Sequence, residues 1–118
     1  KSDFLDLMIS TANETLSGCE MDISGETYSN VVMVAGGYPE GYEKGNVITG
    51  VPENSDETLI FHAGTKFANT DTITNGGRVL SVVSKGTDYK QAVSKSYEIA
   101  DKINYKNKNY RKDIGFDL

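Results

Sequence analysis

The stretch that decides the fold reads RVLSVVSKGTDYKQAVSKSYEIADKI and occupies residues 78–103. Its first part, from Arg78 to Ser84, is rich in valine and leucine and predicts a β-strand. Gly86, followed by Thr87 and Asp88, is typical of a helix start. Side chains at spacings of three and four then form one face of a helix: Tyr89, Ala92, Val93, Ser96, Tyr97, Ala100 and Ile103. The stretch therefore predicts a strand followed by an amphipathic helix.

The sequence before this stretch predicts further strands. Residues 31–35 are consecutive apolar residues, mostly β-branched, which favours a strand that is covered on both faces. Short strands are also expected at residues 46–49 and 58–62, and residues 66–68 and 72–74 flank a turn as a hairpin. Together with two packing helices, these segments predict a small α+β domain with a mostly antiparallel sheet.

The N-terminal residues predict the other helix. Phe4, Met8, Ala12 and Leu16 recur every four residues, which gives one apolar stripe on a helix over residues 3–17. Ser2 or Asp3 would cap its start, and Gly18 would end it.

A glycine-rich loop separates the first strand from the next ones. Residues 36–50 contain five glycines and one proline, which excludes a regular helix. The loop lacks the Gly-Lys-Ser/Thr ending of a Walker loop, so it is not one. Lys44 could reach a substrate anion from it, but we favour a structural role in which Tyr38 and Tyr42 fold the loop onto the sheet.

Composition excludes several classes of function. The chain has 118 residues and a net charge of −5, which argues against binding to nucleic acid. Its longest apolar run, residues 31–35, is far shorter than a membrane span, and we expect a soluble, cytoplasmic protein. Cys19 is the only cysteine, so no intrachain disulfide can form. The carboxylates show no spacing typical of a metal site.

Four short motifs follow one another along the chain: GYPEGYEKG at residues 37–45, HAGT at 62–65, TNGGRVL at 74–80 and YRKDIG at 110–115. In this order and spacing, they resemble the C-terminal domain of glycinamide ribonucleotide synthetases, also called phosphoribosylamine–glycine ligases. The helix at residues 1–20 is similar to the end of the preceding ATP-grasp region in that family, which leaves residues 21–118 as the C-terminal domain.

The resemblance implies an enzyme of purine biosynthesis. Such ligases join the carboxylate of glycine to the amine of 5-phosphoribosylamine, through glycyl phosphate, and release ADP and phosphate. They bind ATP and magnesium with residues of the ATP-grasp region, so this chain is expected to hold no catalytic residue and no metal ligand. Its expected partners are the rest of the ligase chain and the two small substrates. A free-standing binding or interaction module remains the alternative.

The resemblance also implies that this domain helps to hold the phosphorylated sugar. Arg78 and Arg111 are the only arginines of the chain, and a guanidinium can bind phosphate through two parallel hydrogen bonds. Asn75, Gly76 and Gly77 come directly before Arg78, and such glycines let backbone N–H groups approach an anion. We predict Arg78 as the phosphate contact. The alternative is a turn that enters a strand, with Arg78 paired to a carboxylate.

Two other candidates have stronger structural interpretations. Arg111, Lys112 and Asp113 are consecutive, and Asp113 could pair with a basic side chain and fix the tail, with Tyr110 and Ile114 as apolar anchors. His62 could act as a general base, but a histidine at the end of a strand is more often a hydrogen-bonded structural residue.

Overall fold

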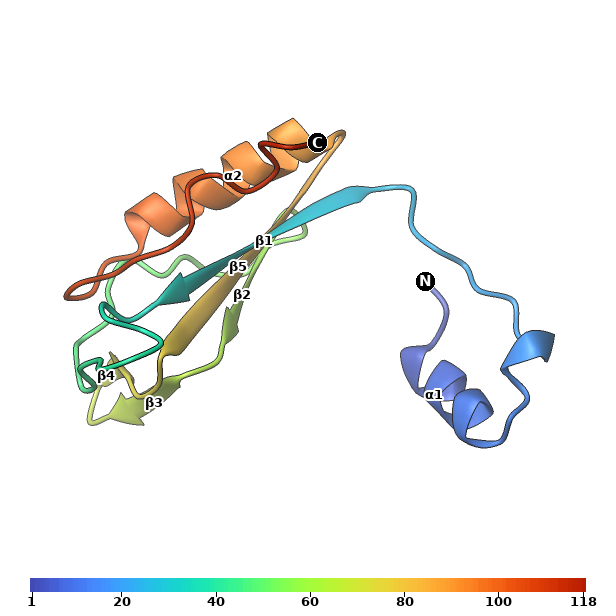
Figure 1. Cartoon of the computed structure of the whole chain (residues 1–118), viewed down its shortest axis with the longest axis horizontal. Coiled ribbons are helices and arrows are strands. Elements are labelled where there is room, and N and C mark those ends of the chain that lie inside the picture. The colour runs from blue at the N-terminus through green and yellow to red at the C-terminus, as the bar shows by residue number, and fades with distance from the viewer.

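The computed structural model describes all 118 residues and confirms the α+β class (Figure 1). The elements in chain order are α1 (Phe4–Ala12), a 3₁₀ turn (Leu16–Gly18), β1 (Thr27–Val34), β2 (Thr58–His62), β3 (Thr65–Ala68), β4 (Asp71–Thr74), β5 (Arg78–Gly86) and α2 (Tyr89–Lys102). Three strands form an antiparallel sheet in the order β1-β5-β2, and the separate hairpin β3-β4 lies between β2 and β5 in the chain. The strand at residues 58–62, the hairpin and the second helix are therefore confirmed.

Helix α2 covers one face of the sheet, where it packs against β1 and β5 (Figure 1). Its buried residues are those of the predicted face, Ala92, Ser96 and Ala100. Ser96 is buried without penalty because its hydroxyl lies 2.6 Å from that of Ser29, which also donates to the carbonyl of Ala92 at 2.8 Å. The apolar core therefore lies between α2 and this face of the sheet.

The opposite face of the sheet is open, which corrects the prediction that the first strand is covered on both faces. Along β1, Val31 and Met33 are fully buried, whereas Val32 and Val34 are only half-buried. Phe61 of β2 has the same outward orientation and is 53% exposed. The β-branched residues reflect strand propensity here, and propensity alone does not tell whether a second layer is present.

A β-bulge determines which face of the sheet Arg78 joins. Val32 pairs with Ser81 and Val34 pairs with Arg78, so two steps along β1 correspond to three along β5. Residues that pair across a ladder share a face, whereas side chains alternate along a regular strand. Regular alternation would place Arg78 with Leu80, beneath α2. The extra residue of the bulge turns Arg78 to the open face instead.

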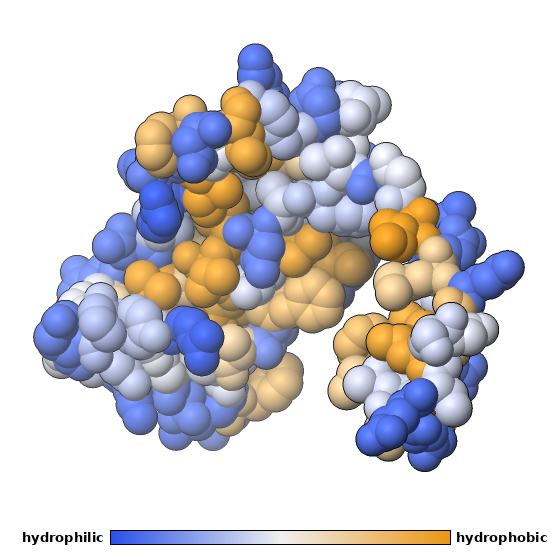
Figure 2. Space-filling model, turned by 45° about the vertical axis from the view of Figure 1, so that its right-hand side comes forward, coloured by the Kyte–Doolittle hydropathy of each residue, from blue (hydrophilic) through white to orange (hydrophobic).

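The N-terminal helix is shorter than predicted and lies apart from the sheet (Figure 1). Asp3 caps it, as one of the two predicted caps, but it ends at Ala12 because Glu14 adopts a positive φ of 59°. Gly18 therefore does not end this helix. None of its residues is buried, and Phe4 is 75% exposed. Apolar side chains consequently remain at the surface of this segment (Figure 2).

No strand forms at residues 46–49, where one was predicted. This segment makes only isolated bridges, from Val47 to Ile73 and from Thr49 to Asn104. Gly50 follows with a φ of +73°, and a Cβ there would lie 2.2 Å from the carbonyl oxygen of Lys102. The chain turns away at this point, so no ladder can continue.

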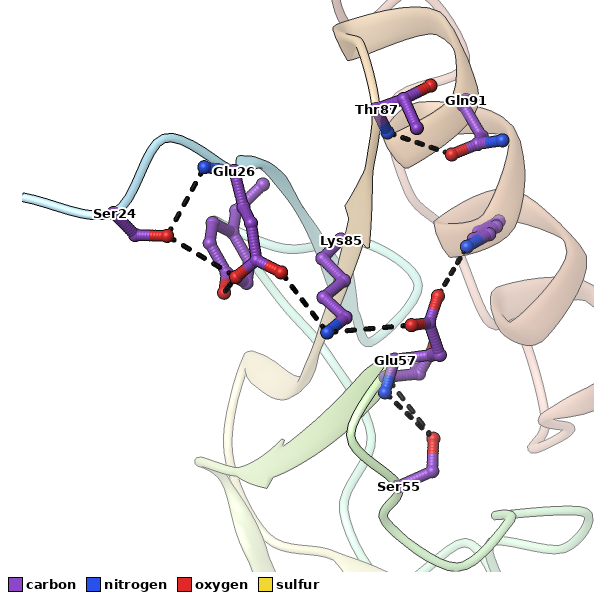
Figure 3. Close-up of polar contacts among 10 residues, drawn as sticks. Ser24, Glu26, Ser55, Glu57, Lys85, Thr87 and Gln91 are labelled. Carbon is purple, nitrogen blue, oxygen red and sulfur yellow. Dashed lines mark hydrogen bonds and ion pairs between the residues drawn. The ribbon is translucent and has the colours of Figure 1, made fainter. Parts of the chain in front are cut away.

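A cluster of ion pairs lies at the C-terminal end of β5, whereas Arg78 stands at the beginning of this strand. The ammonium of Lys85 lies 3.3 Å from Glu26 and 3.5 Å from Glu57, whose other oxygen accepts from Lys95 at 2.6 Å (Figure 3). The hydrogen bond from Lys95 lowers the pKa of Glu57. The cluster connects the residues before β1 to β5 and α2, and water and salt screen it because the carboxylates are exposed.

Removal of the α2 cap tests which helix belongs to the folded domain. The Asp88 carboxylate accepts from the N–H of Gln91 at 2.8 Å, and we expect Asp88→Ala to lower the free energy of unfolding by about 1 kcal/mol. Asp3→Ala removes the equivalent bonds of α1 but should leave domain stability unchanged. Urea unfolding followed by tyrosine fluorescence measures both. An equal loss from Asp3→Ala would contradict the separation of α1 from the domain.

Candidate functional site

Two adjoining clefts occupy the open face of the sheet, near the start of β5. Their volumes are about 540 and 600 Å³. Both are lined by Asn30, Val32, Tyr38 and Arg78, so these residues form the border between them. The bulge thus brings Arg78 to the centre of the hollow part of this surface.

Arg78 is exposed and has no charged partner within the chain. None of the ion pairs includes its guanidinium, although it lines both clefts. The alternative in which Arg78 pairs with a carboxylate at the strand edge is therefore not found. An unpaired guanidinium in a cleft is available to bind an anion.

The turn before Arg78 is held by Gly64. The N–H groups of Asn75 and Gly76 both donate to the carbonyl of Gly64, at 2.7 and 3.1 Å. These two donors are occupied, contrary to the expectation that the whole Asn-Gly-Gly segment would offer N–H groups to an anion. The backbone hydrogen bonds leave only the N–H of Gly77 without a partner, and Gly77 lines the larger cleft.

Position 77 accommodates only glycine, because the ring of Tyr38 occupies the space that a Cβ would need. A Cβ at this position would lie 2.1 Å from Cδ2 of Tyr38. Tyr38 packs in turn near Tyr42, with ring centroids 6.0 Å apart, and Tyr42 lines the same cleft. The glycine-rich loop therefore folds onto the sheet through its tyrosines, as predicted.

Lys44 lines neither of the two clefts. Its ammonium stands 6.0 Å from the centroid of the Tyr42 ring, a weak cation–π contact. The neighbouring Glu43 is paired with Lys106 at 2.8 Å, so Lys44 has no carboxylate partner.

Arg111 and His62 both have structural partners. The guanidinium of Arg111 makes two parallel bonds to the carboxylate of Asp113, at 2.8 and 2.9 Å, which agrees with the structural interpretation. Nδ1 of His62 lies 3.0 Å from the hydroxyl of Thr65, and the ring is exposed outside both clefts. Neither residue is brought to Arg78 as a free group.

Sequence reasoning missed the polar residues that share the clefts with Arg78. Asn30 comes directly before the apolar run of β1, and Ser81 interrupts the apolar residues of β5. Both are polar residues inside strands with one buried face, which is the signal that could have placed them on the open face. Tyr38 lay within a segment that carries the family resemblance, but its contact with Gly77 is not visible in the sequence.

Tyr110, in the C-terminal tail beside the smaller cleft, is expected to make the stability of the fold decrease at alkaline pH. Burial, followed by the hydrogen bond to Asp101, raises the pKa of Tyr110 to about 12. A group with a raised folded-state pKa stabilises the fold below its unfolded pKa of about 10, and the benefit disappears as the pH rises through its folded pKa. We therefore expect the free energy of unfolding to decrease between about pH 10 and about pH 12.

Urea unfolding below pH 10 and towards pH 12 measures this decrease, and Tyr110→Phe should reduce it. The decrease should not vanish, because burial also raises the pKa of Tyr105. An unchanged alkaline decrease in Tyr110→Phe would contradict the assignment.

The chain offers no metal site and no membrane-spanning helix. No group of three or more His, Cys, Asp or Glu side chains is placed to hold a metal ion. No helix is both long and apolar enough to cross a bilayer.

The fold and the clefts define a small α+β domain whose uncovered sheet face presents an unpaired arginine. Residues 28–117 match the family described as "Phosphoribosylglycinamide synthetase, C domain". The chain belongs to this family, which confirms the resemblance carried by the four sequence segments.

Known relatives are similar over nearly the whole chain. The chain is 43% identical to a phosphoribosylamine–glycine ligase of Fusobacterium nucleatum, over 98% of this chain and 28% of the relative. It is 42% identical to a bifunctional purine biosynthetic protein of Pichia angusta, over 97% of this chain and 15% of the relative. The crystal structure of the phosphoribosylamine–glycine ligase from Thermotoga maritima superposes with a TM-score of 0.72 at 36% identity and covers 90% of this chain and 27% of that one. The chain thus spans about a quarter of the length of the bacterial ligases it matches.

Proposed function

We propose that this chain is a fragment of a phosphoribosylamine–glycine ligase that contains its C-terminal domain, and that the whole enzyme acts in purine biosynthesis in the cytoplasm. The enzyme would join the carboxylate of glycine to the amine of 5-phosphoribosylamine at the expense of ATP. The observation that carries this proposal is the similarity of almost the whole chain to one quarter of such a ligase. The chain alone is inactive under this proposal, because the residues for the chemistry lie elsewhere.

Within the ligase, this domain binds the phosphate of 5-phosphoribosylamine. Arg78 makes the charge-assisted contact, and the free N–H of Gly77 adds a second donor from the same cleft. Asn75 and Gly76 form the turn that holds these two groups in place. Lys44, which lies beside the ring of Tyr42, adds positive charge without direct contact and helps to neutralise a dianion.

His62 and Arg111 take no part in this binding. Each is committed to a partner of its own, Thr65 and Asp113 respectively. We assign them to the support of the loop and the tail.

The N-terminal helix belongs to a different part of the ligase. We assign residues 1–20 to the end of the ATP-grasp region and residues 21–118 to the C-terminal domain. The exposed apolar side chains of α1 support this assignment, since such a surface normally packs against a partner: Phe4, Leu5, Met8 and Ile9 are 75, 66, 53 and 49% exposed. The family match, which begins at residue 28, supports it too.

ATP and magnesium are bound by the rest of the ligase chain. ATP supplies the energy that activates the carboxylate of glycine. The contribution of this domain is positional: it fixes the phosphate end of the second substrate so that the amine is held in reach of the activated glycine.

A fused ligase tests the proposal. The segment of the Fusobacterium nucleatum ligase that aligns with this chain is replaced by the chain itself, and ADP release is measured with glycine and 5-phosphoribosylamine. We expect activity well above that of the same ligase with the segment deleted. A fusion that folds, as judged by circular dichroism, but is no more active than the truncated ligase would contradict the proposal and favour a free-standing binding module.

A further inference from the structure

Two polar side chains without partners share the larger cleft with Arg78. Asn30 and Ser81 both line it, and no side-chain hydrogen bond of the chain involves either residue, whereas the neighbouring Ser29 and Ser84 are bonded. An amide and a hydroxyl can each donate and accept. Such a pair suits ligand groups that also do both, which is the chemistry of sugar hydroxyls.

The sheet arranges these groups in a row on one face. Arg78 lies opposite Val34, Ser81 lies opposite Val32, and Asn30 is two residues further along β1. At about 3.3 Å per residue, the row extends over about 13 Å along β1, and all three residues line the same cleft. A phosphorylated pentose has an anion at one end and hydroxyls on its ring, so its polarity matches that of the row.

The remaining surface of the cleft is apolar and aromatic. Val32 lines it, and so do the neighbouring residues Tyr38 and Tyr42. Such surfaces suit the C–H face of a sugar ring, which leaves its hydroxyls to the polar groups. The smaller cleft lacks Ser81 and is bordered by Arg111, which is already committed to a carboxylate.

We propose that Asn30 and Ser81 bind the sugar hydroxyls of the phosphoribosyl substrate while Arg78 holds its phosphate. This assignment rests on the proposed function and adds to it the residues that distinguish a sugar phosphate from phosphate alone. It makes Asn30 and Ser81 specificity-determining residues.

Titration of the 118-residue chain, followed by amide NMR shifts, tests this assignment with two stable probes. Ribose 5-phosphate presents phosphate and hydroxyls, whereas inorganic phosphate presents only the anion. We expect Asn30→Ala and Ser81→Ala each to weaken the binding of ribose 5-phosphate roughly 3- to 10-fold, the loss for one neutral hydrogen bond. Binding of inorganic phosphate should change less than about twofold, since its contact is to Arg78.

Two further variants serve as controls. Asn109→Ala removes an amide that lines only the smaller cleft and should bind both probes like the unmodified chain. Ser81→Thr keeps the hydroxyl and should retain most of the affinity for ribose 5-phosphate.

Three results would overturn the assignment: an equal loss for both probes, no loss for ribose 5-phosphate, or no binding of ribose 5-phosphate to the unmodified chain. The fused ligase separates these from failure of the proposed function. If the fusion is active but any of these three results is found, the roles of Asn30 and Ser81 are refuted and the proposed function still stands.

Discussion

Replacement of Arg78 by alanine in the fused ligase should raise the KM for 5-phosphoribosylamine by roughly one to two orders of magnitude. Hydrogen bonds to charged groups contribute about 1.5–3 kcal/mol, and two parallel bonds to one phosphate belong to the strong end of this range. Arg78 has no ion pair to lose, and its side chain is exposed, so the variant should fold normally. Steady-state kinetics with varied 5-phosphoribosylamine measures the effect.

The chain provides a matched control in its only other arginine. Arg111 is bound to Asp113 through two bonds, so Arg111→Ala should change the KM by less than about threefold. Arg78→Lys keeps the charge but cannot make two parallel hydrogen bonds, so its KM should lie between those of the alanine variant and the unmodified fusion. If Arg78→Ala has no greater effect than Arg111→Ala, the phosphate contact is wrong.

Truncation of Leu80 should produce the largest loss of stability. Leu80 is fully buried on the central strand β5, opposite Met33 on one side and His62 on the other. Buried leucine-to-alanine changes cost about 2–5 kcal/mol, because transfer energy is lost and a cavity remains. The free energy of unfolding of a domain of this size is about 5–15 kcal/mol in total, so Leu80→Ala removes a large part of it. Urea unfolding measures the loss.

Leu59 supplies the control on the same sheet. It lies on β2 and is 41% exposed, so Leu59→Ala should cost less than about 1 kcal/mol. Equal losses for the two leucines would mean that the open face is covered in solution, which would contradict the arrangement of the clefts. We expect truncation of an apolar side chain to cost much stability only on the face of the sheet that α2 covers.

Local signals were sufficient where neighbours in the sequence are also neighbours in space. The cap of α2 by Asp88, the hairpin around Asn69 and the pairing of Arg111 with Asp113 all join residues within a few positions of one another. The predicted face of α2 is buried because helical spacing fixes which side chains point together. These parts of the fold needed no knowledge of the rest of the chain.

The candidate site could be predicted only in part. The scarcity of arginine drew attention to Arg78, and the glycines before it predicted backbone N–H groups close to an anion. In the structure, the carbonyl of Gly64 accepts from two of these N–H groups, those of Asn75 and Gly76. Only the N–H of Gly77 remains for an anion.

The sequence by itself determined the α+β class, the amphipathic helix and the family resemblance, because spacing and short motifs are local properties. Only the tertiary structure decided where Arg78 points. A single extra residue in β5 moves its side chain from the covered face to the open one, beside Asn30 and Ser81. A bulge depends on how two strands pair across the sheet, and the sequence of one strand does not contain that register.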